Sequence, residues 1–129
     1  MTTNDAVVLD ASALIAYARG ERSGAPVARL LDVSCMNAVN VGECVAVLAR
    51  LSSVRAATRA IARLGLHVIQ CDEEIAYQAA AFHAASRLKY TSLSGCICLA
   101  TAWRIGARVI TTDFELQMLG TGVKVEMLR

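Results

Sequence analysis

The feature that most constrains the fold of this chain is the segment AVVLDASALIAY, residues 6–17. Its apolar run stops at Asp10, and the apolar residues that follow recur with helical spacing. This pattern is typical of a buried parallel strand followed by a helix. Open α/β sheets bind their ligands at the carboxyl ends of such strands. Asp10 is therefore predicted either to cap the helix or to belong to a functional site.

The rest of the chain continues to alternate between strand and helix patterns. The remaining strands are predicted at residues 33–39, 66–70, 107–111 and 123–127, of which the first could instead be an extended segment that leads into a helix. The helices are predicted at 11–19, 27–31, 40–51, 54–64, 75–88, 91–105 and 114–119. A turn-rich break is predicted at 20–26. Asn40 and Glu43 have the spacing of a capping box, Ser92 is a predicted helix cap, and Gly106 is predicted to end a helix. The alternation predicts one layered α/β domain over residues 1–129, with a parallel sheet and right-handed crossovers.

Composition argues against several classes of protein. The longest uncharged stretch has 14 residues, fewer than the roughly 18 that a membrane span needs. The first residues lack the basic and apolar regions of a signal peptide, so we expect a soluble, cytoplasmic protein. The five cysteines form an odd number without a C-x-x-C pair, which argues against a disulfide framework and a zinc site.

The positive charge is modest but consists mostly of arginine. The net charge is +2, and eleven of the thirteen basic residues are arginines. Arg55, Arg59 and Arg63 recur at a spacing that places them on one helix face. Because arginine binds phosphate and carboxylate as a planar fork, Arg50, Arg55 and Arg59 are candidates for contact with RNA or a protein partner. The alternative is an ordinary solvated helix face.

Three carboxylates can converge at one edge of the predicted sheet. Asp10 and Asp113 follow predicted strands, and Glu43 lies near the start of a helix that can face them. Such a cluster needs a cation to offset the repulsion between like charges. Ligands that are all oxygens favour Mg²⁺ or Mn²⁺. These ions suit phosphodiester cleavage, because they activate water and stabilise charge on the phosphate.

Four segments, VVLDASALIAY, NVGECVAVLAR, SLSGCICLATAW and ITTDFEL, resemble the PIN domain family in order and spacing, over nearly the whole chain. The small size resembles a VapC-type toxin ribonuclease. The resemblance implies a five-stranded parallel sheet between helices, Mg²⁺- or Mn²⁺-dependent cleavage of RNA, a homodimer, and a cognate antitoxin in the active-site groove. By motif, Asp10, Glu43 and Asp113 match acidic metal-binding positions. Ser12 and Thr112 match the small polar positions beside them, which orient ligands or water.

One position departs from the pattern of the family. The family places an aspartate in S-L-x-D-x-x-x-L-A, where this chain has Gly95. The neighbouring Ser94 and Cys96 are poor partners for Mg²⁺. Glycine inside a helix costs about 1 kcal/mol relative to alanine, so no local structural reason for it is evident. We expect either an inactivating substitution, deliberate or selected, or a natural member with lowered activity.

Three alternatives to a toxin remain. A PIN-like module could bind RNA or protein without cleavage, and an RNA-processing PIN nuclease would differ from a toxin in its partner. A phosphoacceptor receiver domain has a similar size, but Asp10 has no acidic partner beside it and the only lysines are Lys89 and Lys124. The hydrophobic fraction of 56% is more than one small core readily hides, which also predicts a homodimer.

Overall fold

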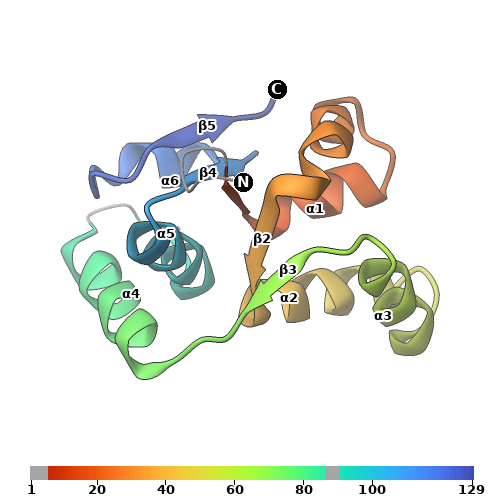
Figure 1. The fold of residues 1–129 in the computed structure, drawn as a ribbon, viewed down its shortest axis with the longest axis horizontal. Coiled ribbons are helices and arrows are strands. Elements are labelled where there is room, and N and C mark those ends of the chain that lie inside the picture. Colours follow the sequence, from red (N-terminus) through yellow and green to blue (C-terminus); the bar gives the residue numbers. More distant parts are fainter. Residues whose placement is uncertain (1–5, 87–90) are drawn as a thin grey trace.

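The centre of the molecule is a five-stranded, fully parallel sheet in the order β3-β2-β1-β4-β5 (Figure 1). The structure is a computed structural model that describes residues 6–86 and 91–129. The strands are β1 (Val7–Leu9), β2 (Ser34–Asn37), β3 (His67–Ile69), β4 (Arg108–Thr111) and β5 (Val125–Met127). The predicted parallel α/β fold is confirmed. The strand order differs from the 2-1-3-4-5 order of receiver domains, so that alternative was wrong.

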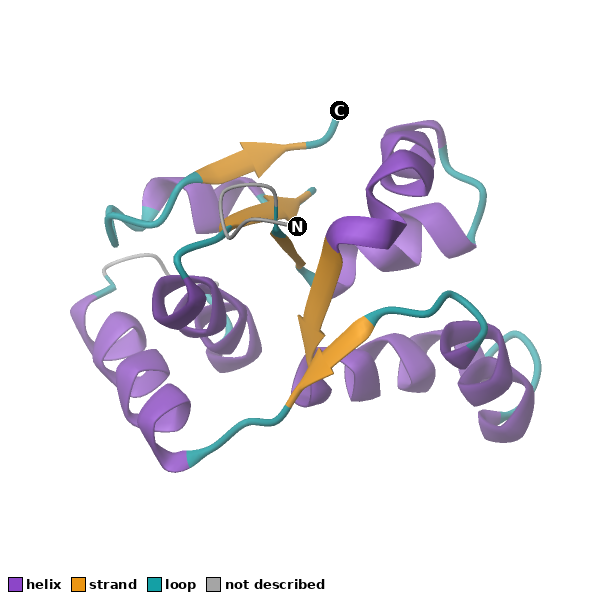
Figure 2. Cartoon of the chain, in the orientation of Figure 1, coloured by secondary structure: helices purple, strands orange, loops and turns teal. Residues whose placement is uncertain are grey.

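Helices cover both faces of the sheet, as Figure 2 shows. The helices are α1 (Ala11–Ala18), the 3₁₀ helix η2 (Arg22–Val33), α2 (Ala38–Ala49), α3 (Val54–Ala62), α4 (Glu73–Ala85), α5 (Leu93–Ile105) and α6 (Phe114–Met118). Successive side chains of a strand point to opposite faces. Val7 and Leu9 accordingly pack with residues of α1, η2, α2 and α3, whereas Val8 packs with residues of α5 and α6. Both faces of β1 are thus buried, which explains its unbroken apolar sequence.

The start of α2 differs from the predicted capping box. The helix begins at Ala38, and its cap is Asn37, whose side chain accepts a hydrogen bond from the Val39 backbone N–H at 2.9 Å. Asn40 therefore lies inside the first turns of α2, where its side-chain amide contacts Glu43 directly. The capping-box prediction was wrong because Asn37 offers an equally good cap three positions earlier.

The structure also differs from the turn-rich break predicted at residues 20–26, because the 3₁₀ helix η2 extends from Arg22 to Val33 through Pro26. Other helix ends were predicted correctly. Ser92 caps α5 by accepting a hydrogen bond from the Gly95 N–H, and Gly106 ends this helix in the left-handed conformation, with φ of 70°. The helix predicted at 75–88 corresponds to α4, but it ends at Ala85, since Ser86 is extended; residues 87–88 lie outside the described residues. Within the described parts of the chain, no helix is long and apolar enough to cross a membrane.

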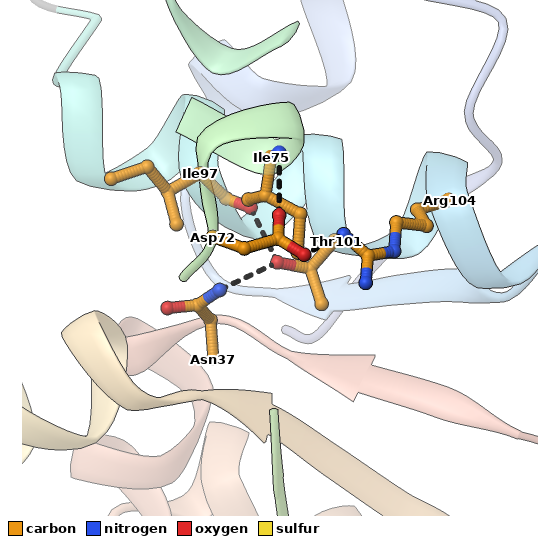
Figure 3. Close-up of polar contacts among 6 residues, drawn as sticks. All are labelled: Asn37, Asp72, Ile75, Ile97, Thr101 and Arg104. Carbon is orange, nitrogen blue, oxygen red and sulfur yellow. Dashed lines mark hydrogen bonds and ion pairs between the residues drawn. The ribbon is translucent and has the colours of Figure 1, made fainter. Parts of the chain in front are cut away.

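Polar contacts join α5 to the elements around it (Figure 3). The buried Asn37 donates from Nδ2 to Thr101 Oγ1 at 3.0 Å, which ties the end of β2 to α5. Arg104, in the last turn of α5, forms an ion pair with Asp72, which also caps α4 through the Ile75 N–H. The position of α5 relative to the sheet and α4 is thus set by directed bonds as well as apolar packing.

Candidate functional site

Asp10 lies where β1 ends at the carboxyl edge of the sheet. Its backbone N–H donates to the Ile110 carbonyl of β4 at 2.9 Å, which continues the strand pairing by one residue. Asp10 occupies the N-cap position of α1, but its side chain makes no capping hydrogen bond. The carboxylate instead accepts hydrogen bonds at Oδ2 from Ser12 Oγ at 2.7 Å and from Thr111 Oγ1 at 2.8 Å. The carboxylate is therefore held in place by side chains rather than used as a cap.

Two hydroxyl groups connect the ends of β1 and β4. Ser12 Oγ accepts a hydrogen bond from the Thr112 backbone N–H at 3.0 Å, and Thr111 Oγ1 accepts one from the Asp113 N–H at 2.8 Å. Each hydroxyl has a single proton, and in both groups it is directed at Asp10. Ser12 thus lies beside Asp10, as its predicted orienting role requires. Thr112 contributes its backbone here, whereas Thr111 supplies the hydroxyl that contacts the carboxylate.

Thr111 was not among the residues selected from the sequence. The strand register places it beside Asp10, because Leu9 pairs with Ile110 and each chain then advances by one residue. A polar last residue on a buried strand was the only local signal. The sequence does not contain the register between strands about 100 positions apart, so it could not distinguish Thr111 from Thr112.

The other two predicted acids approach the same edge from helices. Asp113 caps α6, where its Oδ1 accepts a hydrogen bond from the Glu115 N–H at 2.9 Å. Glu43 lies in the middle of α2, half-buried, and its Oε1 accepts a hydrogen bond from Asn40 Nδ2 at 3.1 Å. Both acids act electrostatically on Asp10. The fold thus brings Glu43 and Asp113 into electrostatic range of Asp10.

Burial has a strong effect on the protonation of Asp10. The side chain is only 6% exposed, and desolvation is the main cause that raises the pKa of its carboxyl group. Hydrogen bonds from Ser12 and Thr111 lower this pKa, and the charges of Glu43 and Asp113 raise it. A bound cation would offset both the desolvation and the repulsion, so the environment of Asp10 favours a positive ligand.

The neighbouring thiols do not compete as ligands. Burial raises the pKa of Cys44 to about 12, with further contributions from Glu43 and Asp10. Burial likewise raises the pKa of Cys98 well above its ordinary value. Because a thiol binds a metal as the thiolate, these side chains stay protonated and inert. The donors available at this edge are oxygens, which suit Mg²⁺ or Mn²⁺.

Gly95 lies in the first turns of α5 and is buried. A β carbon at this position would lie 2.9 Å from Leu116 Cδ2 and 3.1 Å from Ser92 Oγ. Leu116 is itself buried in the core, at 2% exposure. A side chain at position 95 would therefore require the Leu116 side chain to shift, which is a packing reason for glycine that the local sequence did not show.

The carboxylates do not complete a metal site by themselves. Among residues 6–86 and 91–129, no group of three or more His, Cys, Asp and Glu side chains lies close enough to hold a metal ion. The donor chemistry around Asp10 fits a hard cation, and one buried oxygen nearby, Asn40 Oδ1, has no hydrogen-bond partner in the described chain. The oxygen donors around Asp10 are therefore of the kind that binds a divalent cation, but the described acids do not form a complete ligand set for one.

The predicted contact arginines lie away from this edge. Arg50 follows the last residue of α2, seven positions after Glu43, which corresponds to about 10 Å along a helix. Arg55 and Arg59 lie on α3, and all three side chains are exposed. The structure does not bring them to the acids.

Comparison with known proteins gives a consistent result. The model of the PIN domain family matches residues 7–120. None of the curated proteins compared matches this chain. A toxin–antitoxin complex from Klebsiella pneumoniae contains a similar structure, with a TM-score of 0.71 and 21% identity over 92% of this chain and 95% of that chain.

Two further solved structures share the fold. The first is Mycobacterium tuberculosis VapC20, named as a toxin that cleaves the sarcin–ricin loop, with a TM-score of 0.73 and 18% identity over 89% of this chain and 95% of that chain. The second is VapBC-1 from nontypeable Haemophilus influenzae, with a TM-score of 0.71 and 17% identity over 94% of this chain and 96% of that chain. At such identities, the likeness shows a common fold.

Proposed function

The chain belongs to the PIN domain family, and from this premise we propose that it is a divalent-metal-dependent RNA endonuclease and the toxin of a toxin–antitoxin pair. The observation that carries the proposal is the Asp10 carboxylate, buried at the carboxyl edge of the sheet and held by two hydroxyl groups. A carboxylate that is desolvated and faced by two further acids is unfavourable without a cation. Such perturbed groups gather at functional sites.

In this proposal, Asp10, Glu43 and Asp113 hold Mg²⁺ or Mn²⁺. When bound, the ion would activate water for attack on the phosphodiester and stabilise charge on the phosphate and the leaving oxygen. Ser12 and Thr111 fix the orientation of the Asp10 carboxylate through their hydroxyl protons. Asn40 restrains the Glu43 carboxylate through its amide nitrogen. These contacts preorganise the acids before the cation binds.

Gly95 lowers the activity that we expect. It has no side-chain oxygen at the position where the family has an aspartate. We therefore propose that this chain binds the metal and cleaves RNA more weakly, by the same chemistry. The alternative, a PIN-like module that binds RNA or protein without cleavage, is favoured by the same residue and by the absence of a three-acid group among the described side chains.

The proposed protein partner is an antitoxin. One solved structure with this fold is a toxin–antitoxin complex, and others are VapBC and FitAB bound to DNA. The first of these supports such a partner for this chain. An RNA-processing PIN nuclease would share the chemistry but lack this partner. Arg50, Arg55 and Arg59 are proposed contacts for RNA or the antitoxin, because their exposed charges are not engaged in ion pairs with other described residues.

An RNA cleavage assay with and without Mn²⁺ tests the proposed function. The parent chain is expected to cleave slowly, and Gly95→Asp faster, because it restores an oxygen ligand. Gly95→Ala is the matched control, since it adds the same β carbon against Leu116 without a carboxylate. Cleavage should depend on Mn²⁺ and disappear in chelator.

Equal rates for Gly95→Asp and Gly95→Ala would contradict the assigned role of the glycine. If none of the three proteins binds Mn²⁺ or cleaves RNA at saturating metal, the binding-module alternative replaces the nuclease.

A further inference from the structure

A pocket of about 370 Å³ lies between the end of α5, the start of β4 and the segment that leads into β5. Its volume is in the range of roughly 300–1,000 Å³ that is usual for small-molecule sites. Arg108, the first residue of β4, lines this pocket, whereas Thr111, the last residue of the same strand, contacts the Asp10 carboxylate. Three residues of a strand span about 10 Å. The pocket therefore lies at the amino edge of the sheet, apart from the acids.

The exposed aromatic side chain of Trp103 lines the pocket on the side of α5. It lies in the last turn of this helix and is 47% exposed. Its indole N–H has no hydrogen-bond partner within residues 6–86 and 91–129. Gly106 and Gly122 also line the pocket, and a β carbon at either position would meet no atom within 4 Å. A flat ring thus has room to pack against the indole, in a stacked or an edge-to-face arrangement.

Two basic residues, Arg108 and Lys124, line the pocket on the side of the strands, and none of its lining residues is acidic. Arg108 donates from Nε to Glu126 Oε2 at 3.0 Å, and its two terminal nitrogens have no partner in the described part of the chain. Lys124 is exposed and forms no ion pair with any described residue. One acid therefore faces two cations, and the remaining positive charge favours an anionic ligand group.

The end of α5 gives the pocket a polarity. The last carbonyl groups of a helix lack intrahelical partners and carry partial negative charge, and α5 ends at Ile105. This side of the pocket accepts hydrogen bonds from amino groups and disfavours anions. The cations of Arg108 and Lys124 lie on the strand side instead. A matching ligand has an amino-bearing aromatic ring at one end and an anionic group at the other, as a nucleotide does.

We propose that this pocket binds one nucleotide of single-stranded RNA, with the base against Trp103 and the phosphate beside Lys124 and Arg108. Proteins generally bind single strands by stacking bases on aromatic side chains and by contacting the backbone with basic ones. The choice of RNA as the ligand rests on the proposed function. The site itself lies outside the acidic cluster and requires no metal, so RNA bound here stays bound in chelator.

The first test uses the fluorescence of Trp103, which is the only tryptophan of the chain. Short single-stranded oligoadenylate is titrated into the full chain in chelator, and the emission should be quenched to a saturating level as adenine packs against the indole. Inorganic phosphate and an oligoaspartate peptide are the comparison probes, since each supplies anionic groups without a base. Either probe quenching as strongly as oligoadenylate at equal concentration would show that the pocket does not select a nucleotide.

A second test measures the affinity for labelled oligoadenylate by fluorescence anisotropy. Trp103→Ala should bind about 5-fold to 100-fold more weakly, because it loses one stacked base. Trp103→Phe keeps an aromatic ring and should stay within about threefold of the parent. Tyr77→Ala removes another exposed aromatic side chain, on α4, and should leave the affinity unchanged.

The basic side of the pocket is tested by the salt dependence of the same affinity. Lys124→Gln should weaken binding and lower the slope of log affinity against log salt concentration by about 0.7, which corresponds to one phosphate contact with a single strand. Arg29→Gln removes an exposed positive charge from η2, outside the pocket, and should leave this slope unchanged.

The inference is overturned if oligoadenylate does not quench Trp103, or if Trp103→Ala and Lys124→Gln bind it like the parent. Trp103 emission that changes with protein concentration but not with RNA would also overturn it, and would assign the pocket to a contact between copies of the chain. Mn²⁺-dependent cleavage by a parent that fails these tests would support the proposed function alone. Quenching without any Mn²⁺-dependent cleavage would support the pocket alone.

Discussion

At the scale of single residues, Asp10 shows how one sequence position can satisfy two predictions. It stands at the N-cap position of α1, yet its carboxylate makes no capping bond and is held instead by Ser12 and Thr111. The side chain is therefore available for a ligand although the backbone geometry is that of a cap. The cap hypothesis was correct about the place of the residue and wrong about the use of its side chain.

The raised pKa of Asp10 has a consequence for stability. An acid whose pKa is higher in the folded than in the unfolded state favours folding below its unfolded pKa of about 3.9. This contribution is lost as the pH rises through the folded pKa. Asp10→Asn removes the titratable carboxyl group. The free energy of unfolding of this variant minus that of the parent should therefore increase from pH 4 to pH 7. Urea denaturation in chelator measures this difference.

The exposed Asp32→Asn provides a control, because it leaves the buried carboxylate intact. Parallel pH profiles for the parent and Asp10→Asn would contradict the assigned cost of burying this charge. Asp10→Asn should also abolish any stabilisation by Mn²⁺, because it removes a charged ligand of the proposed site.

At the scale of elements, two glycines have different effects on helices. One lies inside a helix, where it lowers helix propensity, and the other ends a helix. Gly42 lies exposed within α2, and Gly106 ends α5 with φ of 70°; a β carbon at either position would meet no atom within 4 Å. Gly42→Ala should raise the free energy of unfolding by about 0.5–1 kcal/mol. Gly106→Ala should lower it by about 1–2 kcal/mol, because the left-handed conformation is strained for alanine.

Chemical denaturation of both variants measures these changes, and each variant serves as the control for the other. A loss of stability in Gly42→Ala would show that α2 has an unrecognised constraint at this position. Neither substitution touches the Asp10 carboxylate, so Mn²⁺ affinity should stay within about twofold of that of the parent.

At the scale of the whole molecule, a number of large apolar side chains are exposed to solvent. Large hydrophobic side chains that are at least 39% exposed occur on β3, on each helix from α2 to α6 and in the turn after α2. They are Val39, Leu51, Val54, Val68, Tyr77, Leu93, Trp103, Phe114 and Met118. We therefore expect a homodimer at micromolar concentration, measured by light scattering. Its melting temperature should rise with protein concentration. A monomer with a concentration-independent melting temperature would contradict this prediction.

The sequence by itself determined the architecture and the edge of the sheet at which two of the candidate acids lie. The alternation of strand and helix patterns predicted a parallel sheet, and the unbroken apolar run before Asp10 predicted a strand buried on both faces. Ser92 and Gly106 marked the ends of α5, since caps are local features of the backbone. Asp10 and Asp113 each follow a buried strand, and the carboxyl ends of parallel strands share one edge of the sheet. Local pattern alone was therefore enough to predict that these two acids lie at the same edge.

Only the tertiary structure decided which groups surround these acids. The choice of Thr111 over Thr112 depends on strand register, and the crowding of Gly95 depends on how Leu116 packs against α5. The unpaired oxygen of Asn40 depends on a contact with Ser94, 54 positions away. Contacts between distant segments follow from packing of the whole chain, which local patterns do not encode. The sequence thus identified the candidate ligands, and the fold decided how each of them is oriented and held.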